Sequence, residues 1–310
     1  MHEGSIARHH RSVAPTAAPY LSTKELPVTL TQGRAFRSLL RNNTAKLGFA
    51  IVVLNVMVAV FAPLITPFSP TSANLSEIVQ PPSRSHPLGT DELGRDILTR
   101  IAYGSRISLT LGIISVGIAL LGGVVLGTLG GYFAGWLDLT IMRLIDVILA
   151  FPPLLLAIVV ISILGPGIRN AMIAVGIAQL PVYARLVRAE VLSNKAREFV
   201  VAARAIGASD LRIMARHILP NSIAPIIVQS TLNIATAILS AAALGYLGLG
   251  AQPPTPEWGT MLSKGRLYLR VAPHVTTFPG LAIVITVLGF NLFGDGLRDA
   301  LDPKMMTVRR

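Results

Sequence analysis

Between two long apolar runs the chain reads Glu198-Phe-Val-Val-Ala-Ala-Arg-Ala-Ile-Gly207-Ala-Ser-Asp-Leu-Arg-Ile-Met-Ala-Arg-His-Ile-Leu-Pro220-Asn221. In its first half, apolar residues recur at the spacing of one helix face, at Phe199, Ala202, Ala203 and Ile206. The pattern predicts a short helix that ends at Gly207, because glycine readily takes the left-handed conformation that closes a helix. Arg197 and Arg204 are expected to point away from the apolar face.

The second half of the segment predicts another short helix. Ser209 and Asp210 suit its N-terminal cap and first turn, where an oxygen can accept free backbone N–H groups and a negative charge faces the positive helix end. Helical spacing then continues through Leu211, Met214, Ala215 and Ile218. The missing N–H of Pro220 is expected to end this helix, so the sequence predicts a helix, a sharp turn and a second helix.

Both predicted helices are too short and too charged to cross a bilayer, yet each has an apolar face that needs cover. Periodicity alone leaves two interpretations open: the segment lies on the membrane surface, or it inserts into a groove on a partner protein. The first would suit a passive channel or scaffold. The second would suit a protein that receives mechanical work from its partner.

The composition is that of an integral membrane protein. Hydrophobic residues make up 52% of the 310 residues, charged residues only 14%, and the mean hydropathy is +0.62. The net charge of +12 would also suit nucleic-acid binding, but 18 of the 27 Lys and Arg residues lie in segments that the apolar runs assign to one side of a membrane. That bias accounts for the basic charge, and no nucleic-acid partner is expected.

Six apolar runs reach the length of about 20 residues that a spanning helix needs. They lie at 47–65, 107–132, 139–164, 171–191, 222–250 and 276–297. The side bias of Lys and Arg predicts that both termini are cytoplasmic. The expected divisions are a cytoplasmic tail (1–46), a first transmembrane helix (47–66), an extracytoplasmic loop (67–106), a core of five transmembrane helices that includes the short helices at 198–220 (107–300), and a cytoplasmic C-terminal tail (301–310).

Prolines and charges interrupt some of the apolar runs. Pro152 and Pro153 in the third run and Pro181 in the fourth predict kinks or breaks. Arg143 and Asp146 lie three residues apart near one end of the third run, and we expect them to pair with each other.

The 67–106 loop carries a dense group of charges. Asp91, Glu92, Arg95 and Asp96 have the spacing of ion pairs on a solvated helix. Mutual pairing is the simplest interpretation, and a direct binding role is the alternative.

The sequence lacks the motifs of the main enzyme classes for a membrane protein. A phosphate-binding loop needs a Gly-Lys dipeptide, and none occurs. No Gly-x-Ser-x-Gly elbow is present, and the six histidines lie outside the apolar runs without a convincing metal-ligand spacing. We therefore expect no catalytic residue, no metal site and no cofactor in this chain, and any energy for transport must enter from a partner.

The segment quoted at the start resembles the signature of ABC-importer permeases. Ala202, Ala203 and Gly207, followed by Leu219 and Pro220, carry the resemblance, while Val201 and His217 stand where the general signature has Glu and Ile. It implies that the two short helices are coupling helices that dock into a cleft of an ATPase subunit. The residues that it implicates in this coupling are Ala202, Ala203, Arg204, Gly207, Ala208, Ser209, Asp210, Leu211, Met214 and Pro220.

Four further blocks, at 86–109, 150–157, 247–262 and 279–303, resemble the dipeptide, oligopeptide and nickel branch of these permeases, in the same order. The resemblance implies an all-α, type I importer permease in a bacterial inner membrane. Its expected partners are a second homologous permease, two subunits that use ATP and Mg²⁺, and an extracytoplasmic substrate-binding protein, with Asp91, Glu92, Arg95 and Asp96 as candidate outer contacts. The branch handles dipeptides, longer peptides, nickel chelates and glutathione, and we expect peptides.

Overall fold

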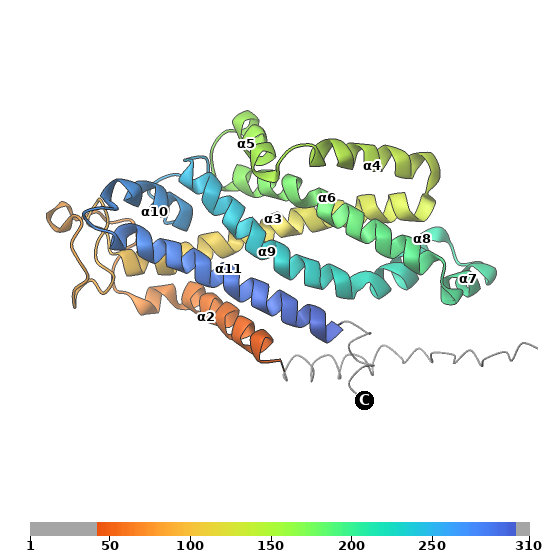
Figure 1. The fold of residues 1–310 in the computed structure, drawn as a ribbon, viewed down its shortest axis with the longest axis horizontal. Coiled ribbons are helices and arrows are strands. Elements are labelled where there is room, and N and C mark those ends of the chain that lie inside the picture. Colours follow the sequence, from red (N-terminus) through yellow and green to blue (C-terminus); the bar gives the residue numbers. More distant parts are fainter. Residues whose placement is uncertain (1–41, 302–310) are drawn as a thin grey trace, which may run out of the picture.

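A computed structural model describes residues 42–301, which form helices and no strand. Its long helices run roughly along one axis and form an elongated bundle (Figure 1). Most of the predicted N-terminal tail and nearly all of the predicted C-terminal tail, residues 1–41 and 302–310, lie outside the described residues. The expected all-α fold is confirmed for the part that the structure describes.

The helices follow the order of the apolar runs. They are α2 (Asn43–Ile65), α3 (Ile97–Phe133), α4 (Gly135–Leu149), α5 (Pro153–Leu164), α6 (Ile168–Lys195), α7 (Glu198–Ala205), α8 (Asp210–Ile213), α9 (Ile223–Tyr246), α10 (Trp258–Gly265) and α11 (His274–Leu301). Among the described residues, five helical stretches are long and apolar enough to cross a membrane, and the count is six if the bent pair α4–α5 forms one span. The six predicted spans correspond to the upper of these two counts.

The third predicted span is broken where its prolines stand. α4 and α5 meet at a bend of 92°. Pro152 has an extended backbone, and Pro153 begins α5, where its missing N–H costs no helical hydrogen bond. Pro181, in contrast, lies inside α6, which continues through it without a break.

The most extensive helix contact in the bundle joins α3 to α6. Gly123, Gly127 and Gly131 repeat every four residues along α3, and this face lies against α6. A Cβ built at Gly127 would lie 2.5 Å from the carbonyl oxygen of Ala184. Glycine therefore lets the two backbones approach, which stabilises helix pairs where lipid supplies no hydrophobic driving force.

The second short helix does not end at Pro220, contrary to the prediction. α8 continues through a π-helical turn (Met214–Ile218) and a 3₁₀ turn (Leu219–Ser222) into α9. In these turns, Asn221 Nδ2 donates to the His217 carbonyl at 2.6 Å and Ser222 Oγ donates to the Ile218 carbonyl at 3.1 Å. The chain passes the proline because the regular hydrogen-bond ladder has already changed there and side chains satisfy the carbonyls.

The predicted pair of Arg143 and Asp146 is wrong. Asp146 instead pairs with Arg185 of α6, with Arg185 Nη2 and Asp146 Oδ1 2.6 Å apart. A second pair, between Asp138 of α4 and Arg188 of α6, has two hydrogen bonds of 2.6 Å. Spacing within one helix could not reveal either pair, because both cross between helices.

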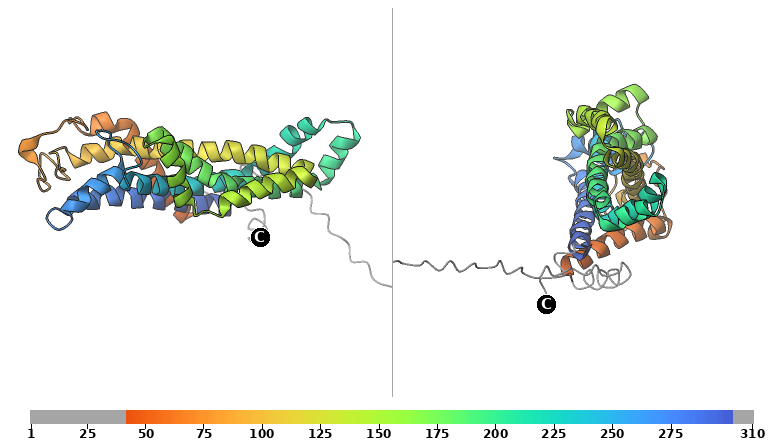
Figure 2. Two further views of the ribbon diagram at one scale, coloured as in Figure 1. Left: turned by 90° about the horizontal axis from the view of Figure 1, so that it is seen from above. Right: turned by 90° about the vertical axis from the view of Figure 1, so that its right-hand side faces the viewer.

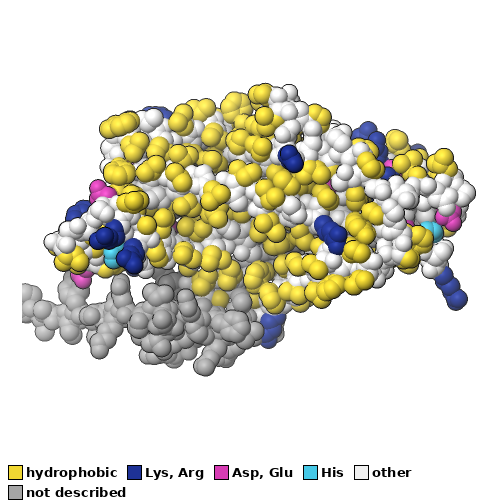
Figure 3. Space-filling view, turned by 180° about the vertical axis from the view of Figure 1, so that it is seen from behind, with side chains coloured by type: hydrophobic (Ala, Val, Ile, Leu, Met, Phe, Trp, Pro, Cys, Tyr) yellow, Lys and Arg dark blue, Asp and Glu magenta, His cyan; other side chains and the backbone are white. Residues whose placement is uncertain are grey.

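The two ends of the bundle differ from its middle. The helices α7 and α8 lie at one end of the long axis, and the loop at 66–96 lies at the other (Figure 2). On the face shown in Figure 3, hydrophobic side chains cover most of the middle, while charged side chains gather mainly toward the two ends. This is the distribution expected when the middle contacts lipid and the ends contact water and headgroups.

Candidate functional site

The elbow, which we define as residues 198–220, projects from one end of the bundle (Figure 1). It connects α6 to α9, so its bases are the last turn of α6 and the N-cap of α9. A buried hydrogen bond joins the two bases: Asn194 Nδ2 donates to Ser222 Oγ at 3.2 Å. The two helices that carry the elbow are therefore tied together where it begins and ends.

The turn within the elbow has the geometry that the sequence predicts for glycine. Gly207 has a φ of +82°, in the left-handed region. Its N–H donates to the Arg204 carbonyl at 3.0 Å, and the Ala208 N–H donates to the Ala203 carbonyl at 3.0 Å. Ser209 occupies the N-cap position of α8, but its side chain makes no capping hydrogen bond.

The inner face of the elbow packs onto the ends of α3 and α6. Its buried residues are Val200, Ala203, Ile213, Met214 and Ile218, which join Tyr132, Val187 and Val191 in one hydrophobic cluster. The predicted apolar face included Ala202 and Ile206, which are exposed, and omitted Val200. An eight-residue helix completes little more than two turns, so a small rotation decides which residues of a mostly apolar helix face inward.

The outer face of the elbow exposes large apolar side chains. Val201, Ile206 and Leu211 are 60%, 86% and 73% exposed, and we call these three residues the tip patch. Of the predicted coupling residues, Ala202, Arg204, Gly207, Ser209, Asp210, Leu211 and Pro220 are exposed, Ala208 is half-buried, and Ala203 and Met214 are buried. The side chains of Ala203 and Met214 thus support the elbow from inside, while the others can reach a partner.

A residue that the sequence did not single out connects the elbow to α3. The hydroxyl of Tyr132, in the last turn of α3, donates to Asp210 Oδ1, and Arg204 Nη2 donates to that hydroxyl at 3.3 Å. Lys195 Nζ donates to the Tyr132 backbone carbonyl and lies 5.2 Å from the centre of its ring. The sequence feature that could have indicated Tyr132 is its place at the end of an apolar run, where the hydroxyl of a tyrosine usually finds a polar partner.

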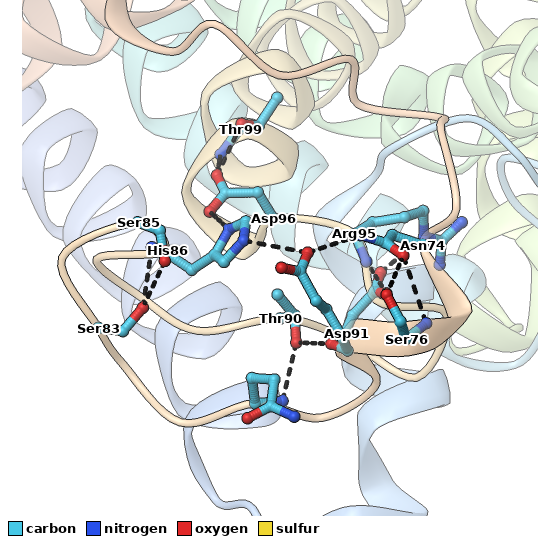
Figure 4. Close-up of polar contacts among 12 residues, drawn as sticks. Asn74, Ser76, Ser83, Ser85, His86, Thr90, Asp91, Arg95, Asp96 and Thr99 are labelled. Carbon is cyan, nitrogen blue, oxygen red and sulfur yellow. Dashed lines mark hydrogen bonds and ion pairs between the residues drawn. The ribbon is translucent and has the colours of Figure 1, made fainter.

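At the opposite end, the predicted charged residues form a buried cluster just before α3 (Figure 4). Arg95 Nε lies 2.7 Å from Asp91 Oδ2, Arg95 Nη2 lies 2.9 Å from Glu92 Oε1, and Arg100 Nε lies 3.2 Å from Asp91 Oδ2. The expected mutual pairing is thus present, but the residues lie in turns and not on a helix. They are also largely buried, so the predicted solvated helix is wrong.

Asp96, the last residue of this group, has a different set of partners. Its Oδ2 accepts hydrogen bonds from the backbone N–H and the hydroxyl of Thr99. Asp96 thereby caps the N-terminus of α3. Its Oδ1 lies 3.0 Å from Nδ1 of buried His86. Asp96 therefore joins the preceding loop to the start of α3.

Two cavities open near this end. The first, of about 270 Å³, lies between the charged cluster and α10, with Asp91, Arg95, Arg100 and Lys264 among its lining residues. The second, of about 500 Å³, is almost entirely apolar and lies between α5, α9, α10 and α11, with Leu154, Leu239 and Tyr246 in its wall. The first cavity thus has charged side chains in part of its wall, whereas the second is lined almost entirely by apolar side chains.

Glu257 is a buried carboxyl group at the start of α10. It is 1% exposed and accepts hydrogen bonds from the backbone N–H groups of Gly259 and Thr260, each at 2.8 Å. Burial raises the pKa of the Glu257 carboxyl, and the hydrogen bonds from Gly259 and Thr260 partly oppose that rise. Among the described residues, no group of three or more His, Cys, Asp or Glu side chains could hold a metal ion.

The fold is similar to a solved ABC transporter. The chain superimposes on a subunit of the MetNI methionine ABC transporter in an inward-facing conformation with a TM-score of 0.53, at 19% identity, over 65% of this chain and 96% of that chain. At that identity the likeness concerns the fold alone.

Sequence comparison decides the family. Residues 123–307, more than half of the chain, match the family described as binding-protein-dependent transport system inner membrane component. The chain belongs to this family. Residues 31–82 of the permease also match the N-terminal transmembrane domain of oligopeptide transport permease C. The resemblance noted from the coupling segment and the four ordered blocks is thereby confirmed.

Curated relatives cover most of the permease. It is 52% identical to the dipeptide transport system permease protein DppC of Alkalihalophilus pseudofirmus, over 87% of this chain and 89% of the relative. It is 46% identical to the glutathione transport system permease protein GsiD of Pectobacterium atrosepticum, over 96% of this chain and 99% of the relative. The permease is therefore a multi-pass membrane subunit of an ABC importer, a type of transporter that works with ATPase and binding-protein partners.

Proposed function

We propose that this permease forms, together with a second permease, the path by which short peptides cross a bacterial inner membrane. A substrate-binding protein would deliver the peptide from outside. Two separate ATPase subunits would bind ATP and Mg²⁺ and drive the change between outward and inward access. The observation that carries this proposal is the elbow, whose inner face is packed into the bundle while its tip patch is left without cover.

The tip patch suits a groove on an ATPase subunit. Val201, Ile206 and Leu211 are all more than half exposed, and Arg204, Arg212 and Arg216 are exposed on the same short segment. Burial of one leucine-sized side chain stabilises a contact by about 1.5–3 kcal/mol. The apolar tip would therefore supply affinity, while the surrounding arginines would favour an acidic rim on the partner.

The elbow is also built to transmit movement. Its inner face shares a hydrophobic cluster with α3 and α6, and the hydrogen bond between Asn194 and Ser222 ties its two bases. A displacement of the ATPase groove would thus move a packed unit and not a loose loop. This supports a docked elbow over the alternative of a passive channel whose elbow rests on lipid.

Short peptides are the substrate that the relatives favour. The DppC relative is named for dipeptide transport, and glutathione, the substrate named for the GsiD relative, is itself a small peptide. Uptake by the reconstituted importer, supplied with a purified substrate-binding protein, should be measured with labelled dipeptide, oligopeptide, glutathione and a nickel chelate. We expect dipeptide uptake that requires ATP. If only glutathione is taken up in a saturable manner, glutathione would replace dipeptides as the assigned substrate.

The orientation follows the charge bias of the sequence, with the elbow and both termini in the cytoplasm. Cysteine accessibility tests it in a chain that has no native cysteine. In the permease expressed without its ATPase subunits, a cysteine at Ile206 should react with a membrane-impermeant maleimide only in inverted vesicles, and one at Leu267, which is 80% exposed near the opposite end, only in right-side-out cells. The reverse pattern would exclude a cytoplasmic elbow.

A charge in the tip patch tests the docking itself. Leu211→Asp and Ile206→Asp should weaken copurification of the ATPase subunits at least about tenfold, because each places a carboxylate in an apolar contact. Leu267→Asp introduces the same charge on an equally exposed residue at the other end and should leave the association unchanged. Intact association of both elbow variants would contradict the proposal.

A further inference from the structure

The elbow is joined covalently to α6 and α9, but not to α3. Its contact with α3 depends on Tyr132, which is 3% exposed and is followed by the turn into α4. The hydroxyl of Tyr132 reaches Asp210 of α8, and Arg204 of α7 reaches the same hydroxyl. Lys195 at the end of α6 donates to the Tyr132 backbone carbonyl and lies over its ring, so Tyr132 of α3 contacts both helices of the elbow and its base.

α3 is the helix that connects the two functional ends of the bundle. It runs without interruption for 37 residues from Ile97 to Phe133, which corresponds to a length of about 55 Å. Its first residues belong to the charged cluster, because Asp96 caps the helix and Arg100 pairs with Asp91. A shift at Tyr132 would therefore be transmitted along this continuous helix to the first cavity, which Lys264 helps to line.

We propose that Tyr132 is a positioning residue that couples the elbow to α3 through its hydroxyl. The inference rests on the proposed docking of the elbow to an ATPase subunit. When the ATPase moves the docked elbow, three helices follow. α6 and α9 follow because the chain joins them to the elbow, and α3 follows through the hydrogen bond from Tyr132 to Asp210. Without the hydrogen bond from Tyr132 to Asp210, the elbow still moves with α6 and α9, but α3 and the charged cluster at its far end follow less closely.

The ring and the hydroxyl of Tyr132 have separable roles. The ring packs with Val200, Ala203 and Val191 in the cluster beneath the elbow. The hydroxyl makes the polar contacts to Asp210 and Arg204. Tyr132→Phe keeps the packing and removes only those contacts, so the variant is expected to fold and assemble.

The experiment measures substrate transported per ATP hydrolysed by the complete importer in proteoliposomes, with a labelled dipeptide as the probe. Tyr132→Phe should lower this ratio about tenfold, the effect expected for a hydrogen bond to a charged group, while the ATPase subunits still copurify. Tyr103→Phe is the matched control, because it lies on the same helix near the other end and contacts Arg106 through its ring. It should leave the ratio unchanged.

A double-mutant cycle identifies the partner. Asp210→Ala should lower the ratio as Tyr132→Phe does, and the double variant should be no worse than either single variant. Asp210→Asn retains an acceptor oxygen and should restore most of the ratio. A purely structural role would move the thermal stability of the complex and not the transport ratio.

The possible results separate this inference from the proposed function. An unchanged ratio for Tyr132→Phe, or additive losses in the cycle, would overturn the role of Tyr132, even if Leu211→Asp abolishes ATPase association. If Leu211→Asp and Ile206→Asp leave that association intact, the docking proposal fails, and the role of Tyr132 fails with it.

Discussion

Arg106 of α3 donates a hydrogen bond from Nε to the Ala59 carbonyl of α2, the carbonyl that Pro63 leaves without its usual helical donor. Nη2 of the same guanidinium donates to the Val60 carbonyl at 2.8 Å. A proline inside a spanning helix is tolerated when a neighbouring side chain supplies the missing donor. The pair therefore joins the first spanning helix to the core of the bundle.

Replacement of Arg106 should loosen α2. Arg106→Met keeps much of the side-chain length but leaves the Ala59 carbonyl unsatisfied, so the free energy of unfolding should fall by about 1–3 kcal/mol. Thermal unfolding of the detergent-solubilised permease measures the change. Arg84→Met, at an exposed position in the preceding loop, is the control and should have little effect. Equal stability of the two variants would exclude this role for Arg106.

The α3–α6 contact makes a second prediction. Gly127→Ala places a Cβ 2.5 Å from the Ala184 carbonyl oxygen and should destabilise the permease by about 1–3 kcal/mol through overpacking. Gly117 lies on the same helix with nothing within 4 Å of its built Cβ. Gly117→Ala should therefore be neutral or slightly stabilising, since alanine favours a helix more than glycine does. Thermal melts of the two variants, compared side by side, check the contrast.

The charged cluster makes a third prediction. Asp91 is 3% exposed and faces both Arg95 and Arg100, so Asp91→Asn removes the one carboxylate that these two buried guanidinium groups share and leaves Arg95 only its pair with Glu92. The expected cost is about 3–5 kcal/mol, felt mainly by the 66–96 loop. Limited proteolysis with trypsin should then cut faster at exposed Arg84. Glu92→Gln is the control, because Glu92 also pairs with Arg95 but is more exposed than Asp91; it should change the cutting rate much less.

Glu257 makes the fourth prediction, about pH. Because burial raises its pKa in the folded protein above the ordinary value of 4.5, the folded protein binds this proton more tightly than the unfolded chain does. The contribution of Glu257 to stability is therefore fully present below pH 4.5 and is lost as the pH rises through the folded pKa. Glu257→Gln cannot titrate, so the stability of the native protein relative to this variant should decline with rising pH in that window. Paired melts across a pH series measure it, and a constant difference would contradict the prediction.

The amino-acid sequence by itself determined the membrane class, the number and order of the spans, the break at Pro152 and Pro153, and the turn at Gly207. These features depend on local properties, namely the length of an apolar run, the missing N–H of proline and the backbone freedom of glycine. The ordered motif blocks were also sufficient to place the chain in its family. All of this information lies within short stretches of residues.

Only the tertiary structure decided which residues meet. Asp146 pairs with Arg185 and not with Arg143, the elbow turns Val200 inward and Ile206 outward, and Tyr132 reaches Asp210 across 78 positions of sequence. Such contacts depend on how helices rotate and cross, and helix periodicity alone does not define that rotation in a run that is apolar on nearly every side. The reason is physical: in a membrane, polar partners and close backbone packing orient the helices, and both arise between elements that are distant in the chain.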